Sequence, residues 1–291
     1  MQRVASNIVK LFKVSRPISW VNTAYPFAAT YLVLGGGVTP LFIIGTLFFL
    51  IPYNLLMYGV NDVFDYESDI RNPRKKSIEG AVEAKSFHPV ILWTAALLLV
   101  PFGIAIVILS PSIQAAAIFS GVIFFVIAYS LKGLRFKEIA FLDSITSSIH
   151  FVGPMIFAIA ATGFHPQAWP FALALFLWGI ASHAFGAVQD VIPDKKGNLQ
   201  SIATIIGARA TVWLSYILYV LAVIVTAGQG GLAYIVAIAG ILYIANISPY
   251  LWITEATSET ANRGWRRFIW LNYIVGAVVT LCIIISVLPS H

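Results

Sequence analysis

The chain has 291 residues, of which 59% are hydrophobic and 10% charged, and its net charge at pH 7 is +6. Because a soluble domain carries about 25% charged residues, this composition excludes an ordinary soluble protein and indicates an integral membrane protein. The basic residues border apolar segments, so the positive charge does not indicate nucleic-acid binding. With Cys282 as its single cysteine, the chain has no internal disulfide framework.

The N-terminal segment, residues 1–16, lacks the continuous apolar stretch of a signal peptide. Its apolar residues Val4, Ile8, Leu11 and Phe12 recur at helical spacing between basic residues. This pattern is typical of an amphipathic helix lying on the membrane surface, and a frayed tail is the alternative.

Nine apolar segments follow, each close to the length of about 20 residues that a helix needs to cross a bilayer. They predict an all-α polytopic membrane protein: one domain over residues 1–291, with nine transmembrane helices in one bundle around a central cavity. The predicted spans are residues 18–37, 41–60, 89–110, 112–130, 139–162, 168–188, 210–228, 230–252 and 267–288.

The connections between these segments differ in charge. Alternate connections are short and lack Lys, Arg, Asp and Glu, whereas the remaining ones and the N-terminal segment hold all 18 basic residues. Because basic residues concentrate on the cytoplasmic side, this pattern predicts a cytoplasmic N-terminus. It also predicts that charged chemistry takes place at the cytoplasmic face of the plasma membrane.

The first acidic motif follows the second predicted span. Asp62, Asp65 and Asp69 are spaced i, i+3 and i+7, so they share one face of a helix that continues from the span. Asn61 lies at the edge of this face. Asn54, one heptad earlier, is expected to extend the polar stripe inward.

The second acidic motif follows the sixth predicted span. Asp190 and Asp194 are four residues apart, and Pro193 between them is expected to bend or end the helix. His183 and Gly186 lie seven and four residues before Asp190, on the same side of the helix.

Ionised carboxylates beside hydrocarbon are costly and mark function. A lone acidic pair would indicate a solvated helix end, but two motifs with upstream polar stripes favour Mg²⁺, which prefers carboxylate and water oxygens and bridges to phosphate. We expect the two motifs to face each other and to hold a diphosphate through the metal. The predicted metal ligands are Asn61, Asp62, Asp65, Asp69, Asp190 and Asp194.

Basic residues near both motifs are candidates for phosphate binding. Lys132, Arg135 and Lys137 alternate beside Tyr129 at the end of the fourth predicted span, and an Arg fork suits phosphate oxygens. Phosphate contact is therefore the preferred interpretation for these three. For the lysines next to the acidic motifs, charges that set topology are preferred. The remaining candidates are Arg71, Arg74, Lys75, Lys76, Lys195 and Lys196.

The fifth predicted span carries a polar stripe of Asp143, Thr146, Ser147 and His150. Such a stripe faces a bundle interior or a wet cavity. It would either line a substrate chamber or join helices through hydrogen bonds, and the sequence leaves both open. His150 and His183 lack a second His at ligand spacing, so they are expected to be structural or substrate-lining.

The chain resembles the UbiA superfamily of intramembrane prenyltransferases. Residues 61–69, NDVFDYESD, resemble its NDxxDxxxD motif, and residues 189–207, QDVIPDKKGNLQSIATIIG, resemble its second, DxxxD motif. Residues 129–138, YSLKGLRFKE, are similar to its YS-x-PP-x-R-x-K segment. The resemblance runs from about residue 14 to residue 288. It departs at Asn198, where the family has a third acidic residue, and at Lys132-Gly133 in place of Pro-Pro.

This resemblance implies Mg²⁺-dependent transfer of a prenyl group from a prenyl diphosphate to a hydrophobic acceptor that enters from the membrane lipid. The segment from Ser15 to Phe27 is most similar to the lycopene elongase branch, which implies dimethylallyl diphosphate as donor and lycopene as acceptor. Prenylation of a hydroxybenzoate, a naphthoate or another lipid is the alternative. The implied catalytic residues are Asp65, Asp190, Tyr129 and Lys132, and the implied substrate-binding residues are Arg16, Asn22, Arg74, Arg135, Lys137 and His183.

A membrane transporter is the non-enzyme alternative. Transporters place charges and broken helices near the membrane midplane, whereas the charges here gather at the ends of the predicted spans. A phosphatidyltransferase would also be acidic and membrane-bound, but its Gly-x-x-Ala-Arg pattern is absent from the acidic motifs.

Overall fold

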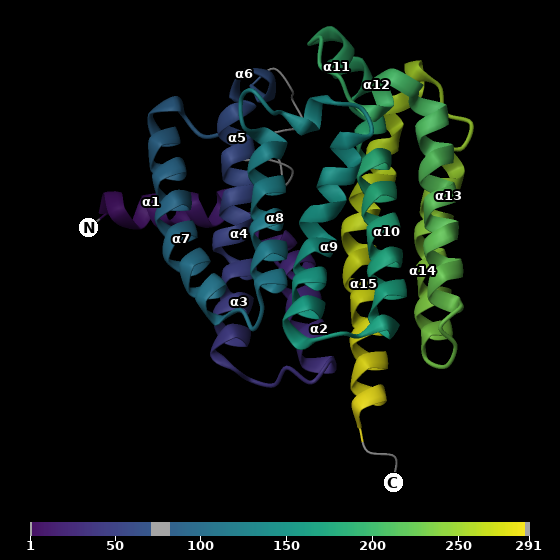
Figure 1. Ribbon diagram of the computed structural model, residues 1–291. Coiled ribbons are helices and arrows are strands. Elements are labelled where there is room, and N and C mark those ends of the chain that lie inside the picture. The colour runs from purple at the N-terminus through teal and green to yellow at the C-terminus, as the bar shows by residue number, and fades with distance from the viewer. Residues whose placement is uncertain (1, 71–81, 289–291) are drawn as a thin grey trace. The chain divides into compact units, whose positions relative to one another are not determined.

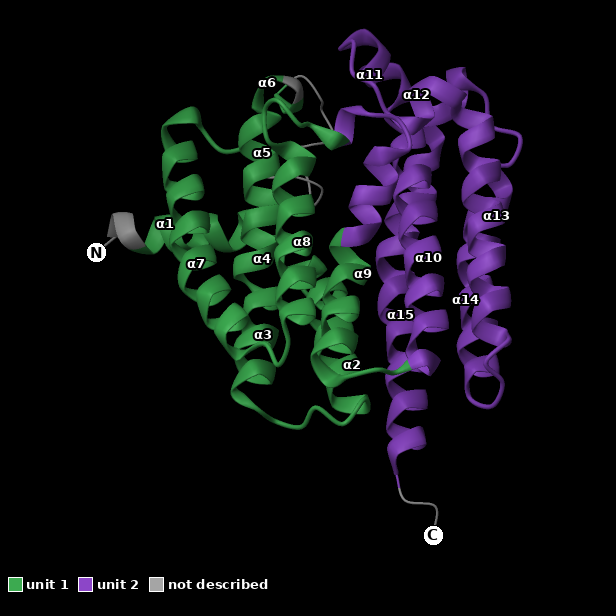
Figure 2. Cartoon of the chain, in the orientation of Figure 1, with its two compact units in different colours: residues 1–136, 150–165 green, residues 137–149, 166–291 purple. Residues whose placement is uncertain are grey.

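The computed structural model describes residues 2–70 and 82–288, which form helices and turns without a strand (Figure 1). The chain divides into two compact units (Figure 2). Unit 1 comprises residues 1–136 and 150–165, and unit 2 comprises residues 137–149 and 166–291. Each unit holds one acidic motif, and the single domain over residues 1–291 stays a prediction.

Eight helical segments of the described chain are long and apolar enough to cross a membrane. They confirm the all-α class and eight of the predicted spans. Large apolar side chains such as Trp93, Ile108 and Leu281 are exposed on them, as expected of surfaces that face lipid. The segments are Pro40–Phe64, Lys85–Leu109, Ile113–Ser130, Leu142–Thr162, Pro166–Val188, Ala208–Ala227, Ala233–Tyr250 and Glu255–Val287.

The first predicted span is the exception. Residues 17–19 form a 3₁₀ turn, and helix α2, Val21–Val33, has 13 residues. At 1.5 Å per residue such a helix is about 20 Å long, shorter than the hydrocarbon thickness of about 30 Å. The count of nine spans is therefore not confirmed.

Unit 1 is built from α1 to α8 and the second part of α9. Its helices pack around aromatic rings that include Phe27, Phe48, Phe49, Phe119 and Phe157. The helices are α1 Gln2–Val14, α2, α3 Pro40–Leu50, α4 Pro52–Asn54, α5 Val60–Phe64, α6 Tyr66–Asp69, α7 His88–Leu109, α8 Ile113–Ser130 and α9 Leu142–Thr162.

The span before the first acidic motif is not one regular helix. Helix α3 ends at Leu50, Pro52 begins α4, and a π-helical turn over Leu55–Gly59 leads into α5. Pro52 has no backbone N–H, which interrupts the hydrogen-bond ladder. The π-helical turn adds a residue to one turn of the helix, so the regular heptad register is lost between α4 and α5.

The prediction that Asn54 extends the acidic stripe is wrong for this reason. Asn54 is fully buried, and its Nδ2 donates to Thr23 Oγ1 at 2.7 Å, to the Phe49 carbonyl at 2.9 Å and to the Leu50 carbonyl at 3.0 Å. Asn54 thus caps the break between α3 and α4 and ties it to α2.

The N-terminal helix α1 runs across the other helices of unit 1 (Figure 1). Ile8 and Phe12 are more than half exposed, whereas Val14 is fully buried, and Leu11 packs against the unit 1 core. The exposed apolar residues are compatible with a helix on a membrane surface, which stays a prediction.

Unit 2 holds the first part of α9 and α10 to α15. Its core contains Phe185, Tyr219, Tyr243 and Phe268, with Trp178 stacked on Phe268 at 5.6 Å between ring centres. The helices after α9 are α10 Trp169–Val188, α11 Val191–Lys196, α12 Ile202–Ile206, α13 Ala208–Ala227, α14 Ala233–Ile247 and α15 Asn262–Val287.

The last span begins earlier than predicted. A capping box between Thr254 and Thr257 starts a 3₁₀ segment, Glu255–Ala261, that runs directly into α15. The basic residues assigned to the loop before residue 267 therefore lie on helix. Local side-chain hydrogen bonds at Thr254, rather than hydropathy, set this helix start.

We expect Asn54→Ala to destabilise unit 1, because two backbone carbonyls in an apolar region would lose a side-chain donor. A buried polar group left without its partner costs about 1–3 kcal/mol. Thermal unfolding in detergent checks this, with Asn7→Ala on α1 as the matched control. Equal unfolding temperatures for the two variants would contradict the role of Asn54.

Candidate functional site

In unit 1, the first acidic motif contains a buried ion pair. Arg16 Nη2 lies 2.6 Å from Asp62 Oδ1, and the exposed fractions of the two side chains are 16% and 2%. The Arg16 guanidinium also covers the Tyr58 ring, 4.3 Å from its centre. Burial acts to lower the pKa of Arg16, but Asp62, Tyr58 and Asp69 together raise it, so the pKa lies above its ordinary value.

Two further contacts join the same motif to the end of α8. Ser130 Oγ donates to Asn61 Oδ1 at 3.0 Å, and Arg135 Nη2 lies 3.5 Å from Asp65 Oδ1. The Arg135 and Asp65 side chains are 27% and 15% exposed, so this pair is looser and wetter than the Arg16 pair. Asp69, whose N–H bonds to the Asp65 carbonyl, is buried.

The two arginines at this motif share a backbone feature. Arg16 has φ 51° and Arg135 has φ 42°, in the left-handed region that costs a residue with a side chain about 1–3 kcal/mol. Such strain persists only where the surroundings hold it, so unit 1 presents both cations to the motif at a conformational cost.

The other predicted site residues of unit 1 are more dispersed. Tyr129 packs edge-on against the buried His150, 5.0 Å between ring centres. Lys132 is exposed, and Asn22 is half-buried. Lys137, the first residue of unit 2, is also half-buried. The remaining predicted cations lie outside the described residues, namely Arg71, Arg74, Lys75 and Lys76.

In unit 2, the second acidic motif starts where α10 ends. Asp190 is the residue before α11, and the Asp194 N–H bonds to its carbonyl at 2.8 Å. Pro193 lies within the first turn of α11, so the expected helix break occurs just before Asp190. Lys195 pairs with Glu255 at 2.7 Å on the exposed surface, which agrees with a surface charge of little energetic weight.

Among the described residues, hydrogen-bond donors hold the buried Asp143 on α9. Its Oδ1 accepts from the Ser144 N–H at 2.6 Å and the Ser144 hydroxyl at 3.1 Å, and its Oδ2 accepts from the Ile202 N–H at 2.8 Å. Ser144 Oγ also lies 3.1 Å from His183 Nδ1 on α10. Of the two interpretations of the fifth span, Asp143 fits the joining of helices.

The carboxylates and the amide oxygen of these motifs are of the chemical type that Mg²⁺ prefers. Within the described part of either unit, no three His, Cys, Asp or Glu side chains form a closed ligand group. At the first motif, Arg16 pairs with Asp62 and Arg135 pairs with Asp65. These arginines balance the negative charge of the two carboxylates. The metal ligand assignments stay predictions.

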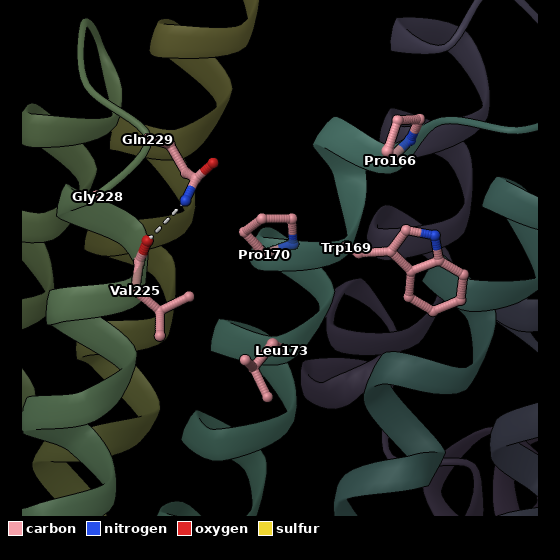
Figure 3. A pocket seen from close by; sticks show the side chains of 7 residues that line it. All are labelled: Pro166, Trp169, Pro170, Leu173, Val225, Gly228 and Gln229. Atoms are coloured by element: carbon pink, nitrogen blue, oxygen red, sulfur yellow. Dashed lines mark hydrogen bonds between the residues drawn. The ribbon is translucent and has the colours of Figure 1, made fainter.

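A separate groove of about 690 Å³ lies at the other end of α10 from Asp190 (Figure 3). Its lining is apolar apart from Gln229, whose Nε2 donates to the Val225 carbonyl at 3.1 Å. It contains none of the predicted site residues, and we assign it no chemistry. The groove is lined by Pro166, Trp169, Pro170, Leu173, Val225, Gly228 and Gln229.

Sequence reasoning missed three contacting residues: Tyr58, Ser130 and Ser144. Ser130 belongs to the YS-x-PP-x-R-x-K-like segment, so the sequence contained a pattern that could have indicated its place in the site. No sequence pattern indicated Tyr58 or Ser144, because their roles depend on contacts with distant parts of the chain.

Comparisons with known proteins add to this geometry. The model of the UbiA prenyltransferase family matches residues 23–283. The lycopene elongase/hydratase of Corynebacterium glutamicum is 49% identical over 93% of this chain and 94% of its own length. The C(50) beta-cyclic carotenoids biosynthesis protein LbtBC of Dietzia sp. is 48% identical over 97% of this chain and 66% of its own length.

Solved structures share the fold at low sequence identity. A digeranylgeranylglyceryl phosphate synthase gives a TM-score of 0.67 at 20% identity, covering 96% of this chain and 98% of its own. A UbiA homologue from Archaeoglobus fulgidus bound to DMAPP and Mg²⁺ gives 0.60 at 19% identity, covering 96% and 100%.

We expect removal of one partner of the Arg16–Asp62 pair to cost more than removal of both. Arg16→Met would leave a buried carboxylate without its cation, a loss of about 3–5 kcal/mol, whereas Arg16→Met with Asp62→Leu should recover much of it. Thermal unfolding in detergent measures this, with Arg267→Met at an exposed position as control. A double variant as unstable as the sum of the single variants would show that the two side chains are not coupled.

Proposed function

Starting from the fact that this chain belongs to the UbiA prenyltransferase family, we propose that it transfers a dimethylallyl group to the end of lycopene. The chain is a membrane-embedded prenyltransferase, and the similarity to a lycopene elongase/hydratase over nearly its whole length is the observation that carries the choice of acceptor. The paired arginines at the first acidic motif support the choice of a diphosphate donor.

We assign the metal to Mg²⁺ and its candidate ligands to Asn61, Asp65 and Asp69 in unit 1 and to Asp190 and Asp194 in unit 2. Bound there, the ion would neutralise the diphosphate and make it a better leaving group. Asp62 is left out of this set, because Arg16 already satisfies one of its oxygens at 2.6 Å. Its proposed role is to anchor Arg16.

The two arginines of the first motif have different roles in this proposal. The Arg135–Asp65 contact of 3.5 Å is long for an ion pair, and little energy holds the guanidinium there. Arg135 would then be available to the phosphate oxygens, and Asp65 would be available as a ligand of the metal. Arg16, tightly held by Asp62, supplies fixed positive charge against the departing diphosphate.

The remaining predicted residues fit this scheme as secondary contacts. The exposed Lys132 and the half-buried Lys137 follow α8 directly, which suits recognition of the outer phosphate oxygens. The Tyr129 ring, held edge-on by His150, offers an aromatic face to an allylic cation. Asn22 is assigned to substrate binding with less structural support.

The acceptor and the cation need an apolar environment. An alkene is a weak nucleophile, so the allylic cation must persist until the double bond attacks, and water must be excluded. Spans with large exposed apolar side chains let a carotenoid enter from the bilayer. By the distribution of basic residues, we place the diphosphate end at the cytoplasmic face of the plasma membrane.

We expect activity to vanish when EDTA removes divalent metal and to return with added Mg²⁺. Asp65→Asn and Asp190→Asn should each reduce transfer by about 100-fold or more, since even an outer-shell partner of a metal ligand is worth about 10–100-fold. The measurement is product formation by purified protein in detergent, with Glu259→Gln at an exposed position as control. Full activity in metal-free buffer would contradict the metal assignment.

We expect lycopene and dimethylallyl diphosphate together to give C45 and C50 products, identified by mass spectrometry of the lipid extract. The same reaction with 4-hydroxybenzoate or a dihydroxynaphthoate should give no prenylated product. The reverse result, a prenylated aromatic acid and unchanged lycopene, would overturn the proposed acceptor and leave the family membership intact.

A further inference from the structure

In unit 2, α9 and α10 pack antiparallel at close range. Ser148 Oγ donates to the Phe176 carbonyl at 2.6 Å, and a Cβ on Gly179 would clash with Ser148 Oγ and lie 3.0 Å from Ser148 Cα. Glycine is therefore needed for this approach. One helical turn further toward the acidic end on each helix, Ser144 meets His183, with Oγ and Nδ1 3.1 Å apart.

The hydrogen bonds of Asp143 fix which nitrogen of His183 carries hydrogen. Ser144 Oγ donates its single hydroxyl hydrogen to Asp143 Oδ1 at 3.1 Å. Ser144 Oγ can then only accept at its contact with His183, and Nδ1 of the imidazole is the donor. In the neutral ring, Nε2 consequently carries the basic lone pair.

Asp143 is itself locked in position. It is fully buried, and its second oxygen accepts from the Ile202 N–H at 2.8 Å, at the first residue of α12. The chain from Ile202 through Asp143 and Ser144 to His183 thus sets the orientation of the imidazole. With Nδ1 directed at α9, the Nε2 edge of the ring is directed away from α9.

His183 lies at a suitable distance from the second acidic motif. It precedes Asp190 by seven residues, about 10 Å at the rise of an α-helix, and α10 ends at Val188, two residues before Asp190. Its neighbours Ala181, Ala184 and Phe185 are buried, whereas His183 is only half-buried. A base therefore lies roughly two helical turns from the proposed metal ligand Asp190. This distance is long enough to accommodate the allylic group and the end of the acceptor.

We infer that His183 Nε2 is the base that accepts the proton released when the reaction ends, an inference that rests on the proposed function. The C–O bond of the donor breaks and the diphosphate leaves with the electron pair. The alkene π pair of the acceptor forms the new C–C bond, which leaves a tertiary cation. An adjacent C–H bond then gives its proton to Nε2, and its electron pair forms a new double bond.

The same base serves when water, rather than elimination, ends the reaction. The water oxygen bonds to the tertiary cation, and the proton that it sheds goes to Nε2, which gives a hydroxylated product. In both cases the imidazole gains one proton, and Asp143 stabilises the resulting charge through Ser144. Ser144 and Asp143 are positioning residues in this scheme, and His183 is catalytic.

The test uses full-length protein with Mg²⁺, dimethylallyl diphosphate and lycopene, and measures both the rate of transfer and the pattern of products. His183→Gln and His183→Ala should lower transfer about 100-fold, the order of magnitude of general base catalysis. The residual product should become a mixture of double-bond positions, because the cation would lose its proton to no single base. Ser144→Ala should reduce transfer less and broaden the product pattern in the same direction.

Added imidazole separates a chemical role from a structural one. It should restore transfer at least fivefold to His183→Ala, whose side chain leaves space for it, and should leave Asp190→Asn unchanged. His165→Gln, a half-buried histidine of unit 1, is the matched control and should keep wild-type rate and products.

Two results would overturn the inference: wild-type rate and product pattern in both His183 variants, or loss of transfer that imidazole does not restore. Failure of the proposed function is distinguishable from either, because wild-type protein would then form no prenylated carotenoid in the same assay.

Discussion

An ionised carboxylate next to hydrocarbon needs a partner, and both units of this protein are organised around that requirement. Unit 1 meets it with positive charge: Arg16 lies 2.6 Å from Asp62 in a nearly dry setting. Unit 2 meets it at Asp143 with hydrogen-bond donors. The first solution fixes where charge can act on a ligand, and the second fixes the relative placement of α9, α10 and α12.

The carboxylates that position other groups differ from the carboxylate proposed to bind metal. Asp62 and Asp143 are buried and held by close contacts, so they hold other groups in place. Asp65 differs, because its contact with Arg135 is 3.5 Å long and partly exposed. A carboxylate that can exchange a guanidinium for a metal ion needs such a weak contact. In unit 1, Asp62 and the proposed metal ligand Asp65 therefore differ in burial and contact distance rather than in residue type.

Much of the fold follows from local sequence. Eight spans were predictable because their length and hydropathy leave no other stable arrangement in a membrane, and the spacing of Asp62, Asp65 and Asp69 indicated their helical setting. The contacts were not predictable. Arg16 and Asp62 are 46 residues apart, and Asp143 and Ile202 are 59 apart, so only the folded chain brings them together. Periodicity also failed at Asn54, since a regular helix was assumed across residues 55–59, where the chain forms a π-helical turn.

The π-helical turn over Leu55–Gly59 has a consequence for how this protein can evolve. It separates the register of the helix below it, where Asn54 is tied to α2, from that of α5 above it. Loss of one residue in this turn would restore a regular helix and rotate α5 by about 100° relative to α4. Substitutions in α3 and α4, the part of the span that packs against α2, can therefore accumulate independently of those in α5, the part that carries the acidic motif. Deletion of a single codon between the two parts would not be tolerated.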